Sequence, residues 1–339
     1  MTSIPRPLVP PVESELARTV HRPLGLVRLL FILGMVTLIA CVVLVQGMSL
    51  LGAALPASQI AYVAWDRMEG ESTLELLDVR QRQAVALYQW IGQLDTPTWT
   101  PDGQTLIFAR DREDRLGRDL AALDLPSLDF RWLTHGPYDN TAPDVSPDGR
   151  SVLFQRDTRS PSQWDVHVLD LDSGETRPIF EGGGIDGQPD WSADGRSLTY
   201  DMSWNGYTEM YTTLYVLPFG DDQPGEDPLR VVGSNSFTGD WSPDGTALAF
   251  ASSRDGSYDI YRADVAGRTV ERLTHHPYSD FAPAWSPDGG LIAFISRRDS
   301  DGEAHLFVMH ADGTEVRRLS PSVLTGTRSY FYPAWRPSP

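Results

Sequence analysis

The stretch that decides the fold reads Pro-Ala-Trp-Ser-Pro-Asp-Gly, at residues 283–289. Similar stretches recur along the chain, and their Trp position falls at residues 99, 145, 191, 241, 285 and 335, with Val at 145. Neighbouring copies lie 44 to 50 residues apart. A repeat of this length, with short apolar segments between turns, is typical of a β-propeller, in which each repeat forms one blade.

Each copy predicts a tight turn followed by strands. In Ser-Pro-Asp-Gly, Pro presets φ at the second position, Asp suits the third, and Gly accepts a positive φ at the fourth. An apolar segment follows each turn, as at residues 106–108 or 248–250. A third and a fourth segment come next, as at 166–169 and 270–274. The pattern predicts four antiparallel strands in each repeat.

The last copy supplies only a first strand, at residues 333–336. Strands two, three and four of that repeat are expected at residues 59–63, 74–77 and 84–88, which have the matching apolar character. One blade is then shared between the two ends of the repeat region. Such sharing pairs both open edges and closes a ring of six blades.

These residues resemble the TolB-type propeller family, which is related to the WD-repeat class. Its motif is P-x-W-S-P-D-G, followed by I-A-F and then by I-Y-x-x-D. The resemblance covers nearly all of residues 58–339. It implies an all-β, six-bladed propeller. TolB proteins carry an α/β domain before the propeller, which makes part of their partner contacts. Here a membrane anchor and a short linker are expected in that place.

An uncharged and mostly apolar segment, residues 29–45, predicts this anchor. With its apolar flanks it reaches the roughly 20 residues that span a bilayer. Arg18, Arg22 and Arg28 precede the segment, and the next charge after it is Asp66. The positive-inside rule then places the N-terminus in the cytoplasm.

The expected organisation therefore has three parts. Residues 1–23 form a short cytoplasmic tail, residues 24–55 a single transmembrane helix, and residues 58–339 a propeller outside the cell membrane. Two alternatives stay open. A signal peptide could be cleaved near residues 52–54. Cys41 could be lipidated, because residues 38–41 read Leu-Ile-Ala-Cys and resemble a lipoprotein box. All three interpretations place the propeller outside the cytoplasm.

The charge of the chain limits its partners. The 28 basic residues are all Arg and stand against 46 acidic residues. Residues 58–339 hold 24 Arg and 44 acidic residues, a net charge of −20. Nucleic acids and anionic lipids need a basic surface, so neither is expected as the main partner. The single cysteine excludes an internal disulfide and a Cys-based metal site. We expect no cofactor, no metal and a monomeric propeller.

The candidate binding site is the mouth of the channel. The first strand of each blade lines a propeller channel, and the segments before these strands surround its mouth. Here those segments are rich in His, Tyr and Asp, which suit a polar and pH-sensitive interface. The predicted ligand-binding residues are His135, Tyr138, Asp139, Asp186, Asp240, His275, His276, Tyr278, Asp280, Tyr330 and Tyr332.

The sequence favours binding over catalysis. It contains no G-x-S-x-G, H-E-x-x-H or P-loop motif. No catalytic residue is predicted. The expected function is a non-catalytic binding or scaffold module that recruits a protein or an envelope ligand at the channel mouth. The alternative is a carbohydrate-active propeller, lyase-like or hydrolase-like, or a glycan-binding one.

Overall fold

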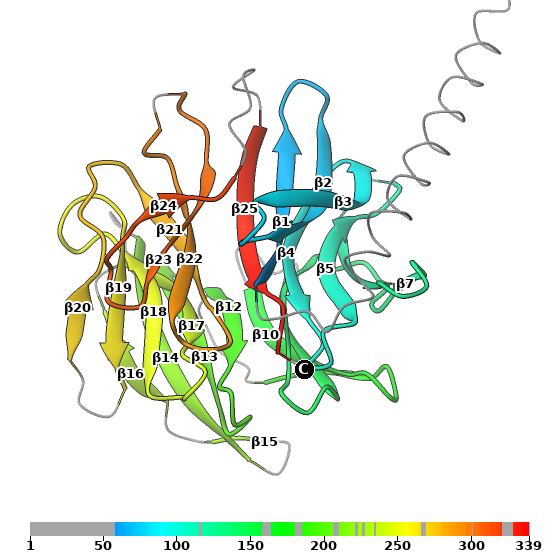
Figure 1. Cartoon of the computed structure of the whole chain (residues 1–339). Coiled ribbons are helices and arrows are strands. Elements are labelled where there is room, and N and C mark those ends of the chain that lie inside the picture. The colour runs from blue at the N-terminus through cyan, green and yellow to red at the C-terminus, as the bar shows by residue number, and fades with distance from the viewer. Residues whose placement is uncertain are drawn as a thin grey trace, which may run out of the picture. The chain divides into compact units, whose positions relative to one another are not determined.

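The computed structural model describes residues 58–114, 117–157, 164–179, 185–205, 210–220, 223–225, 228–233, 235–265, 269–299, 301–320 and 328–338. The strands within these ranges form six sheets, which are the blades of a propeller (Figure 1). The predicted six-bladed fold is confirmed. No helix in this part of the chain is long and apolar enough to cross a membrane. The predicted tail and anchor, residues 1–55, lie outside the described residues.

Four blades follow the expected order of four antiparallel strands. The first contains β4 (Leu94–Trp99), β5 (Thr105–Asp111), β6 (Arg118–Asp124) and β7 (Phe130–Trp132). The second contains β8 (Asn140–Val145), β9 (Ser151–Asp157), β10 (Trp164–Asp170) and β11 (Thr176–Pro178). The fourth contains β17 (Ser236–Trp241), β18 (Ala247–Ser252), β19 (Asp259–Asp264) and β20 (Val270–Arg272). The fifth contains β21 (Asp280–Trp285), β22 (Leu291–Ser296), β23 (His305–His310) and β24 (Arg317–Arg318).

The third blade departs from the four-strand pattern. It contains β12 (Ile185–Trp191), β13 (Ser197–Asn205), β14 (Met210–Gly220), β15 (Gln223–Pro224) and β16 (Leu229–Val232). β16 takes the place of the fourth strand beside β14. The end of β14 runs on and folds back as a hairpin with β15. This hairpin has no counterpart in the repeat pattern, so the sequence repeat did not predict it.

The sixth blade joins the two ends of the propeller. Its strands are, in order, β25 (Arg328–Trp335), β1 (Gln59–Asp66), β2 (Glu71–Asp78) and β3 (Gln83–Ile91). β25 pairs antiparallel with β1, from Ile60 opposite Trp335 to Asp66 opposite Arg328. Figure 1 shows β25 beside β1 at the centre of the view. The shared blade is therefore as predicted, although its first strand begins well before the expected 333–336.

The turn chemistry also matches the prediction. Gly149 has φ of 73°, in the left-handed region, and its N–H donates to the Ser146 carbonyl over 2.8 Å. The Ser146 hydroxyl donates to Asp148 over 2.6 Å. This bond and the Arg150 N–H lower the pKa of the Asp148 carboxyl. The equivalent Asp fixes the turn in the same way in the first five copies of the motif.

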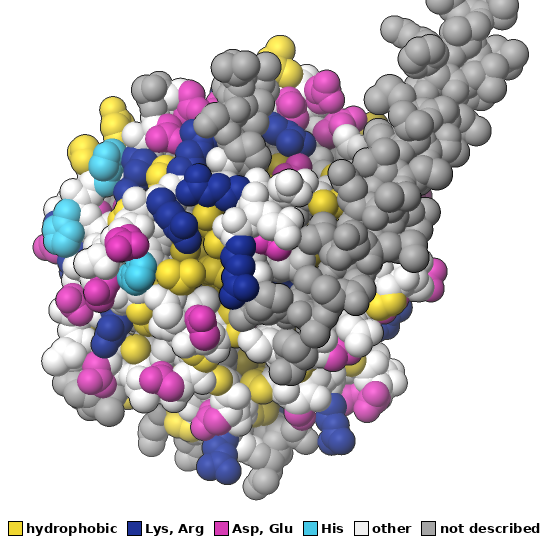
Figure 2. Space-filling model, in the orientation of Figure 1, with side chains coloured by type: hydrophobic (Ala, Val, Ile, Leu, Met, Phe, Trp, Pro, Cys, Tyr) yellow, Lys and Arg dark blue, Asp and Glu magenta, His cyan; other side chains and the backbone are white. Residues whose placement is uncertain are grey.

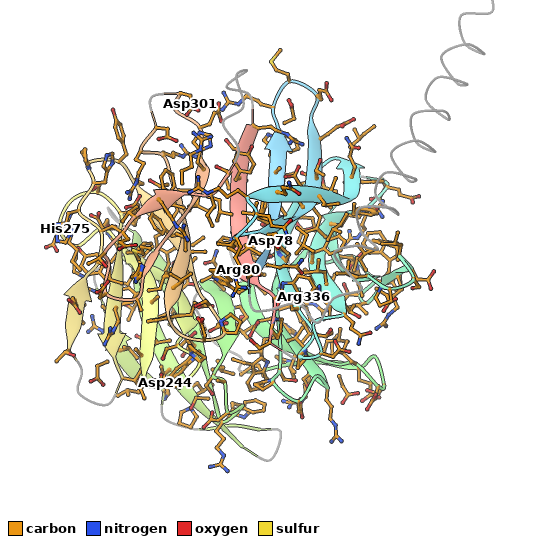
Figure 3. All side chains as sticks on the ribbon, viewed as in Figure 1. Asp78, Arg80, Asp244, His275, Asp301 and Arg336 are labelled. Carbon is orange, nitrogen blue, oxygen red and sulfur yellow. The ribbon has the colours of Figure 1, made fainter. Side chains whose placement is uncertain are left out.

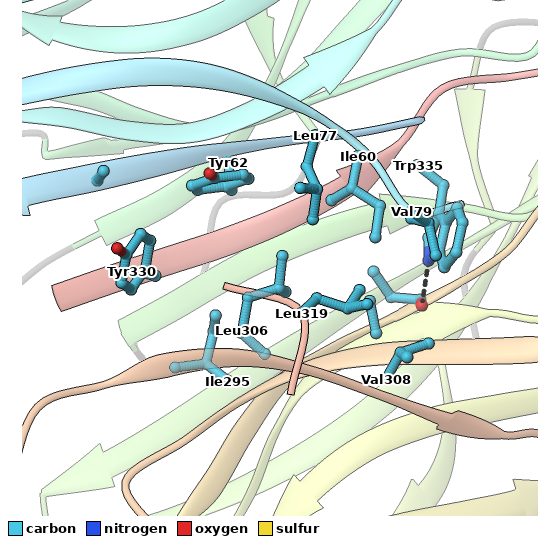
Figure 4. Packing of buried hydrophobic residues seen from close by; sticks show 14 of the residues in the cluster. Ile60, Tyr62, Leu77, Val79, Ile295, Leu306, Val308, Leu319, Tyr330 and Trp335 are labelled. Atoms are coloured by element: carbon cyan, nitrogen blue, oxygen red, sulfur yellow. Dashed lines mark hydrogen bonds between the residues drawn. The ribbon is translucent and has the colours of Figure 1, made fainter. Parts of the chain in front are cut away.

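Apolar side chains fill the space between neighbouring blades. Figure 4 shows the layer between the fifth and sixth blades, where Ile60, Tyr62 and Leu77 face Ile295 and Leu306. The recurring Trp side chains belong to such layers and are at most 9% exposed. Burial of this kind contributes about 25 cal/mol for each Å² of apolar surface. The rigid inter-blade packing fixes the first strands around the channel.

Candidate functional site

All six first strands carry the same irregularity, a β-bulge with one residue in the left-handed region. The six residues have φ between 35° and 54° and are Thr96, Ala142, Gln188, Thr238, Ala282 and Tyr332. Five of them precede Pro, a position that normally favours an extended backbone. Bulges of this kind bend a strand and redirect its side chains. Backbone strain repeated at one place in six blades marks a wall that the packing holds in a single shape.

The six bulges line a single cavity of about 540 Å³ in the channel. Its lining also includes Pro243, Pro287 and Pro337, which follow the first strands of their blades. The described residues that line it include none from the segments before the first strands. The cavity therefore lies toward the Ser-Pro-Asp-Gly end of the channel, opposite the mouth that the sequence pointed to.

The two halves of the cavity wall differ in chemistry. The residue before the recurring Trp position is Asp in the second, third and fourth blades, at Asp144, Asp190 and Asp240. The fifth and sixth blades have Ala284 and Ala334 there. The first blade has Thr at this position, and its hydroxyl donates to Asp144 over 3.2 Å. One half of the wall is acidic and the other is small and apolar.

Each of the three aspartates binds the backbone of the next blade. The Trp191 N–H donates to Asp144 Oδ2 over 2.7 Å. The Trp241 N–H donates to Asp190 over 3.1 Å, and the Trp285 N–H donates to Asp240 over 2.6 Å. The acidic half-wall is thus built into the contacts between consecutive blades.

The indole groups follow the same division. Trp99 Nε1 donates to the Ala334 carbonyl over 3.1 Å, and Trp335 Nε1 donates to the Ala284 carbonyl over 3.0 Å. Where Asp replaces Ala on the preceding blade, the indole N–H of the next Trp is buried without a partner among the described residues, at Trp191, Trp241 and Trp285. Neighbouring blades are therefore joined through the indole on the apolar side and through a carboxylate on the acidic side.

Burial changes the ionisation of the three carboxyls. It raises the pKa of Asp144 to about 6 and that of Asp240 to about 7. It also raises the pKa of Asp190 well above its ordinary value, and the charges of Asp144 and Asp240 add to this effect. Closely spaced carboxyls in a partly dry cavity cannot all be ionised at neutral pH without cost. A cationic group entering the channel would favour their ionised form.

Two of the residues predicted from the sequence line this cavity, Asp240 and Tyr332. The negative charge of Asp95 and burial together raise the pKa of the Tyr332 hydroxyl. Tyr330 is instead 1% exposed, and its ring packs 5.7 Å from that of Tyr62. Asp280 is completely buried and forms an ion pair of 2.7 Å with Arg298.

The remaining predicted residues lie outside the cavity lining, Asp186 in β12 and the others in loops. His135 and His275 are exposed, and Tyr138 and Tyr278 are 36% and 59% exposed. Figure 3 shows His275 at the edge of the molecule, far from β25.

Two of the other predicted residues make local contacts. Asp139 accepts a hydrogen bond from the Arg118 N–H, and His276 lies 5.6 Å from the Tyr278 ring. The side chain of Asp186 is outside the described part of the structure. These residues stay predictions.

The site predicted from the sequence did not include Asp144 and Asp190. A signal was present, since Asp occupies the same motif position in three consecutive copies. The described residues contain no group of three or more His, Cys, Asp and Glu side chains that could hold a metal ion. The face shown in Figure 2 mixes Arg and acidic side chains, so charge alone does not single out another surface there.

Comparison with known proteins agrees with the fold. Residues 230–338 match the TolB beta propeller domain family. A stretch of 64 residues is 39% identical to the "Tol-Pal system protein TolB" of Syntrophus aciditrophicus (strain SB). That stretch spans 18% of this chain and only 14% of the relative.

Two solved structures are similar over most of this chain. TolB from Acinetobacter baumannii superposes with a TM-score of 0.71 and 21% identity, over 83% of this chain and 67% of that one. A putative TolB from Agrobacterium tumefaciens has a TM-score of 0.61 and 22% identity, over 82% and 99% of the two chains. At these identities the structures support the fold alone, while the family match and the curated relative confirm the predicted resemblance.

Proposed function

We propose that this chain, which resembles the TolB-type propellers, is a non-catalytic protein-binding module of the cell envelope. In this proposal a segment of a partner protein enters the channel and contacts the wall made by the six bulges. The propeller is held outside the cell membrane by the anchor expected at residues 24–55. The name of the curated relative, a Tol-Pal system protein, supports an envelope role.

The main support for this proposal is that the cavity wall has an acidic half and a small apolar half. A segment that fits it has basic or hydrogen-bond-donating side chains toward Asp144, Asp190 and Asp240, and small apolar ones toward Ala284 and Ala334. The net charge of −20 on residues 58–339 would also attract a basic segment from a distance. A wall that is already rigid loses little conformational freedom when it binds, which favours affinity.

The same wall supports a binding role over an enzymatic one. Each of the three aspartates already accepts a backbone N–H from the next blade. A carboxylate held in this way is less available as a proton donor or acceptor for a substrate. The exposed loops with His135, Tyr138, His275 and Tyr278 remain predicted sites of first contact.

The proposal is tested by filling the channel without disturbing the acidic contacts. Ala334→Arg places a long cationic side chain on the apolar half-wall and leaves the Ala334 carbonyl available to Trp99. Val270→Arg is the matched control, because Val270 is 39% exposed and does not line the cavity. The tagged full-length chain is purified from cross-linked membranes in all three forms.

We expect the wild type and Val270→Arg to retain the same partner protein and Ala334→Arg to lose it, with equal melting temperatures. Retention of that partner by Ala334→Arg would contradict binding in the channel. Failure of every form to retain any protein would contradict a protein-binding role.

A further inference from the structure

A second and smaller cavity lies where the ring is closed. It has a volume of about 250 Å³ and is lined by residues of β25, β1, β2 and β4 and of the segment before β4. Tyr332 lines both this cavity and the larger one, whereas Asp95 lines only this one. The small cavity is therefore a neighbour of the channel cavity and has its own lining. We refer to it as the seam pocket.

The most buried residues of the seam pocket are Val63, Leu94 and Ser72, whose hydroxyl donates to the Gly92 carbonyl, and three of its half-buried residues are aromatic. Val63 and Leu94 are 1% and 5% exposed. Trp65, Phe331 and Tyr332 are half-buried. Aromatic surfaces of this kind suit a ligand with a flat apolar face.

Asp95 gives the pocket one polar anchor. Its Oδ2 accepts a hydrogen bond from Arg118 Nη1 over 2.8 Å, so the carboxylate charge is already balanced. Its Oδ1 is buried and makes no hydrogen bond of ordinary geometry among the described residues, but the Tyr332 hydroxyl lies beside the carboxyl and interacts with it. A carboxylate oxygen can accept more than one hydrogen bond, so a ligand N–H or O–H would donate to Oδ1 alongside the Tyr332 hydroxyl. Because Arg118 neutralises Asp95, the pocket favours a neutral ligand over an ionic one.

The size of the pocket limits the ligand further. At about 250 Å³ it is below the usual 300–1,000 Å³ of drug-sized ligand sites. It suits a single small unit, such as one sugar residue. The exposed Gln93 at its edge supplies an amide, which can both donate to and accept from hydroxyl groups.

We propose that the seam pocket binds one residue of an N-acetylated amino sugar. Its acetamido methyl group would contact Val63 and Leu94, and its amide N–H would donate to Asp95 Oδ1. One face of the sugar ring would lie against Trp65 and Phe331. This site goes beyond the channel function and does not depend on it.

A neutral sugar fits this environment better than an acidic one. The net charge of −20 on residues 58–339 repels anionic sugars, and Asp95 offers an acceptor where a carboxylate ligand would need a donor. The same chemistry occurs in sugars of a polymer and of a glycolipid, so the test uses a free monosaccharide that represents both.

The probe is the methyl glycoside of N-acetylglucosamine, titrated into the full-length protein and followed by ligand-observed NMR. The methyl glycoside of glucose, which lacks the acetamido group, is the first comparison. N-acetyltryptophanamide is the second, because an indole would also present an apolar face and one N–H donor. We expect the acetamido sugar to bind roughly tenfold more tightly than the glucoside. We expect N-acetyltryptophanamide not to displace it.

Phe331→Leu should weaken binding of the acetamido sugar roughly tenfold, through loss of the aromatic surface. Phe281→Leu is the matched control, because Phe281 has the equivalent place in β21 and does not line the pocket. Equal binding of both sugars, absence of binding to the folded protein, or unchanged binding by Phe331→Leu would overturn the proposal. Displacement of the sugar by N-acetyltryptophanamide would also overturn it, and would assign the pocket to a protein side chain.

Discussion

Arg336 shows how a single residue can adapt a repeat to a special position. The repeat has Ser after its Trp position in four of six copies, one of which has Val145 at that position, while the last copy has Arg. Arg336 Nε donates to the Gly103 carbonyl and Nη1 donates to Gln59 Oε1, each over 2.8 Å. The guanidinium also lies 5.2 Å from the Trp99 ring. One side chain thereby joins the end of the ring to β1 and to the first blade.

We therefore expect Arg336→Ser, which restores the repeat residue, to destabilise the propeller. The loss of two hydrogen bonds and a cation–π contact should cost about 2 kcal/mol of unfolding free energy. Urea denaturation measures this cost. Arg80→Ser is the control, since Arg80 is exposed and its substitution should change stability by less than about 0.5 kcal/mol. Equal stability of the two variants would show that the contacts of Arg336 do not stabilise ring closure.

The raised pKa of Asp240 predicts a pH dependence with a definite sign. The folded protein keeps a proton on this carboxyl up to about pH 7, whereas the unfolded chain loses it near its ordinary value of 3.8. Between these values the folded state binds more protons, so its stability falls as the pH rises. The contribution of Asp240 is largest below pH 4 and is lost by about pH 7.

Asp240→Asn should therefore reduce the loss of stability between pH 5 and pH 7, by up to about 1 kcal/mol per pH unit. Asn keeps an oxygen that can accept the Trp285 N–H. Urea denaturation at several pH values gives the slope. Asp244→Asn is the control, because the Ser242 hydroxyl and the Thr246 N–H lower the pKa of Asp244, so that it does not titrate in this range. The idea fails if wild type and Asp240→Asn have the same slope.

At the scale of the element, the six first strands share one backbone shape, but the hydrogen bonds that join each of them to the preceding blade differ. Trp335 and Trp241 occupy equivalent places in β25 and β17, and both are at most 9% exposed. Only Trp335 donates its indole N–H to the preceding blade. The Asp190 carboxylate, which binds the Trp241 backbone, takes the place of that bond.

This difference predicts unequal effects of the same substitution. Trp335→Phe removes a hydrogen bond and leaves the Ala284 carbonyl without its donor, whereas Trp241→Phe removes an N–H that has no partner. Both lose similar apolar contact. We expect Trp335→Phe to cost about 1 kcal/mol more of unfolding free energy than Trp241→Phe, measured by urea denaturation. A larger loss of stability for Trp241→Phe than for Trp335→Phe would contradict the two kinds of hydrogen bond between blades.

The strands and turns could be predicted because their causes are local. Ser-Pro-Asp-Gly encodes its own turn, and the apolar segments after it encode the strands. The early start of β25 and the β14–β15 hairpin lie outside the repeated motif, so the repeat could not indicate them. Asp280 is buried because it pairs with Arg298, just after the neighbouring strand β22, and Tyr330 is buried because it packs against Tyr62, which is distant in sequence. Only the packed blades show that these two side chains are buried.

At the scale of the whole propeller, the ring is symmetric in backbone and asymmetric in chemistry. Six equivalent bulges surround one cavity, and aspartates occupy the same place in three consecutive blades. The mouth predicted from the sequence and the cavity found in the structure lie at opposite ends of the channel. The central claim is that the cavity, with its acidic and apolar halves, is where a partner protein binds.

Site-specific photo-cross-linking in intact cells tests this claim most directly. A photoreactive phenylalanine analogue is introduced at Ala334 in the cavity, at Tyr278 in an exposed loop and at Val270 on the outside. We predict a discrete cross-linked protein from position 334 and none from position 270. Position 278 reports whether the loops also touch that protein. Cross-linking from position 278 with none from position 334 would contradict binding in the cavity. It would indicate that the partner binds at the opposite mouth of the channel.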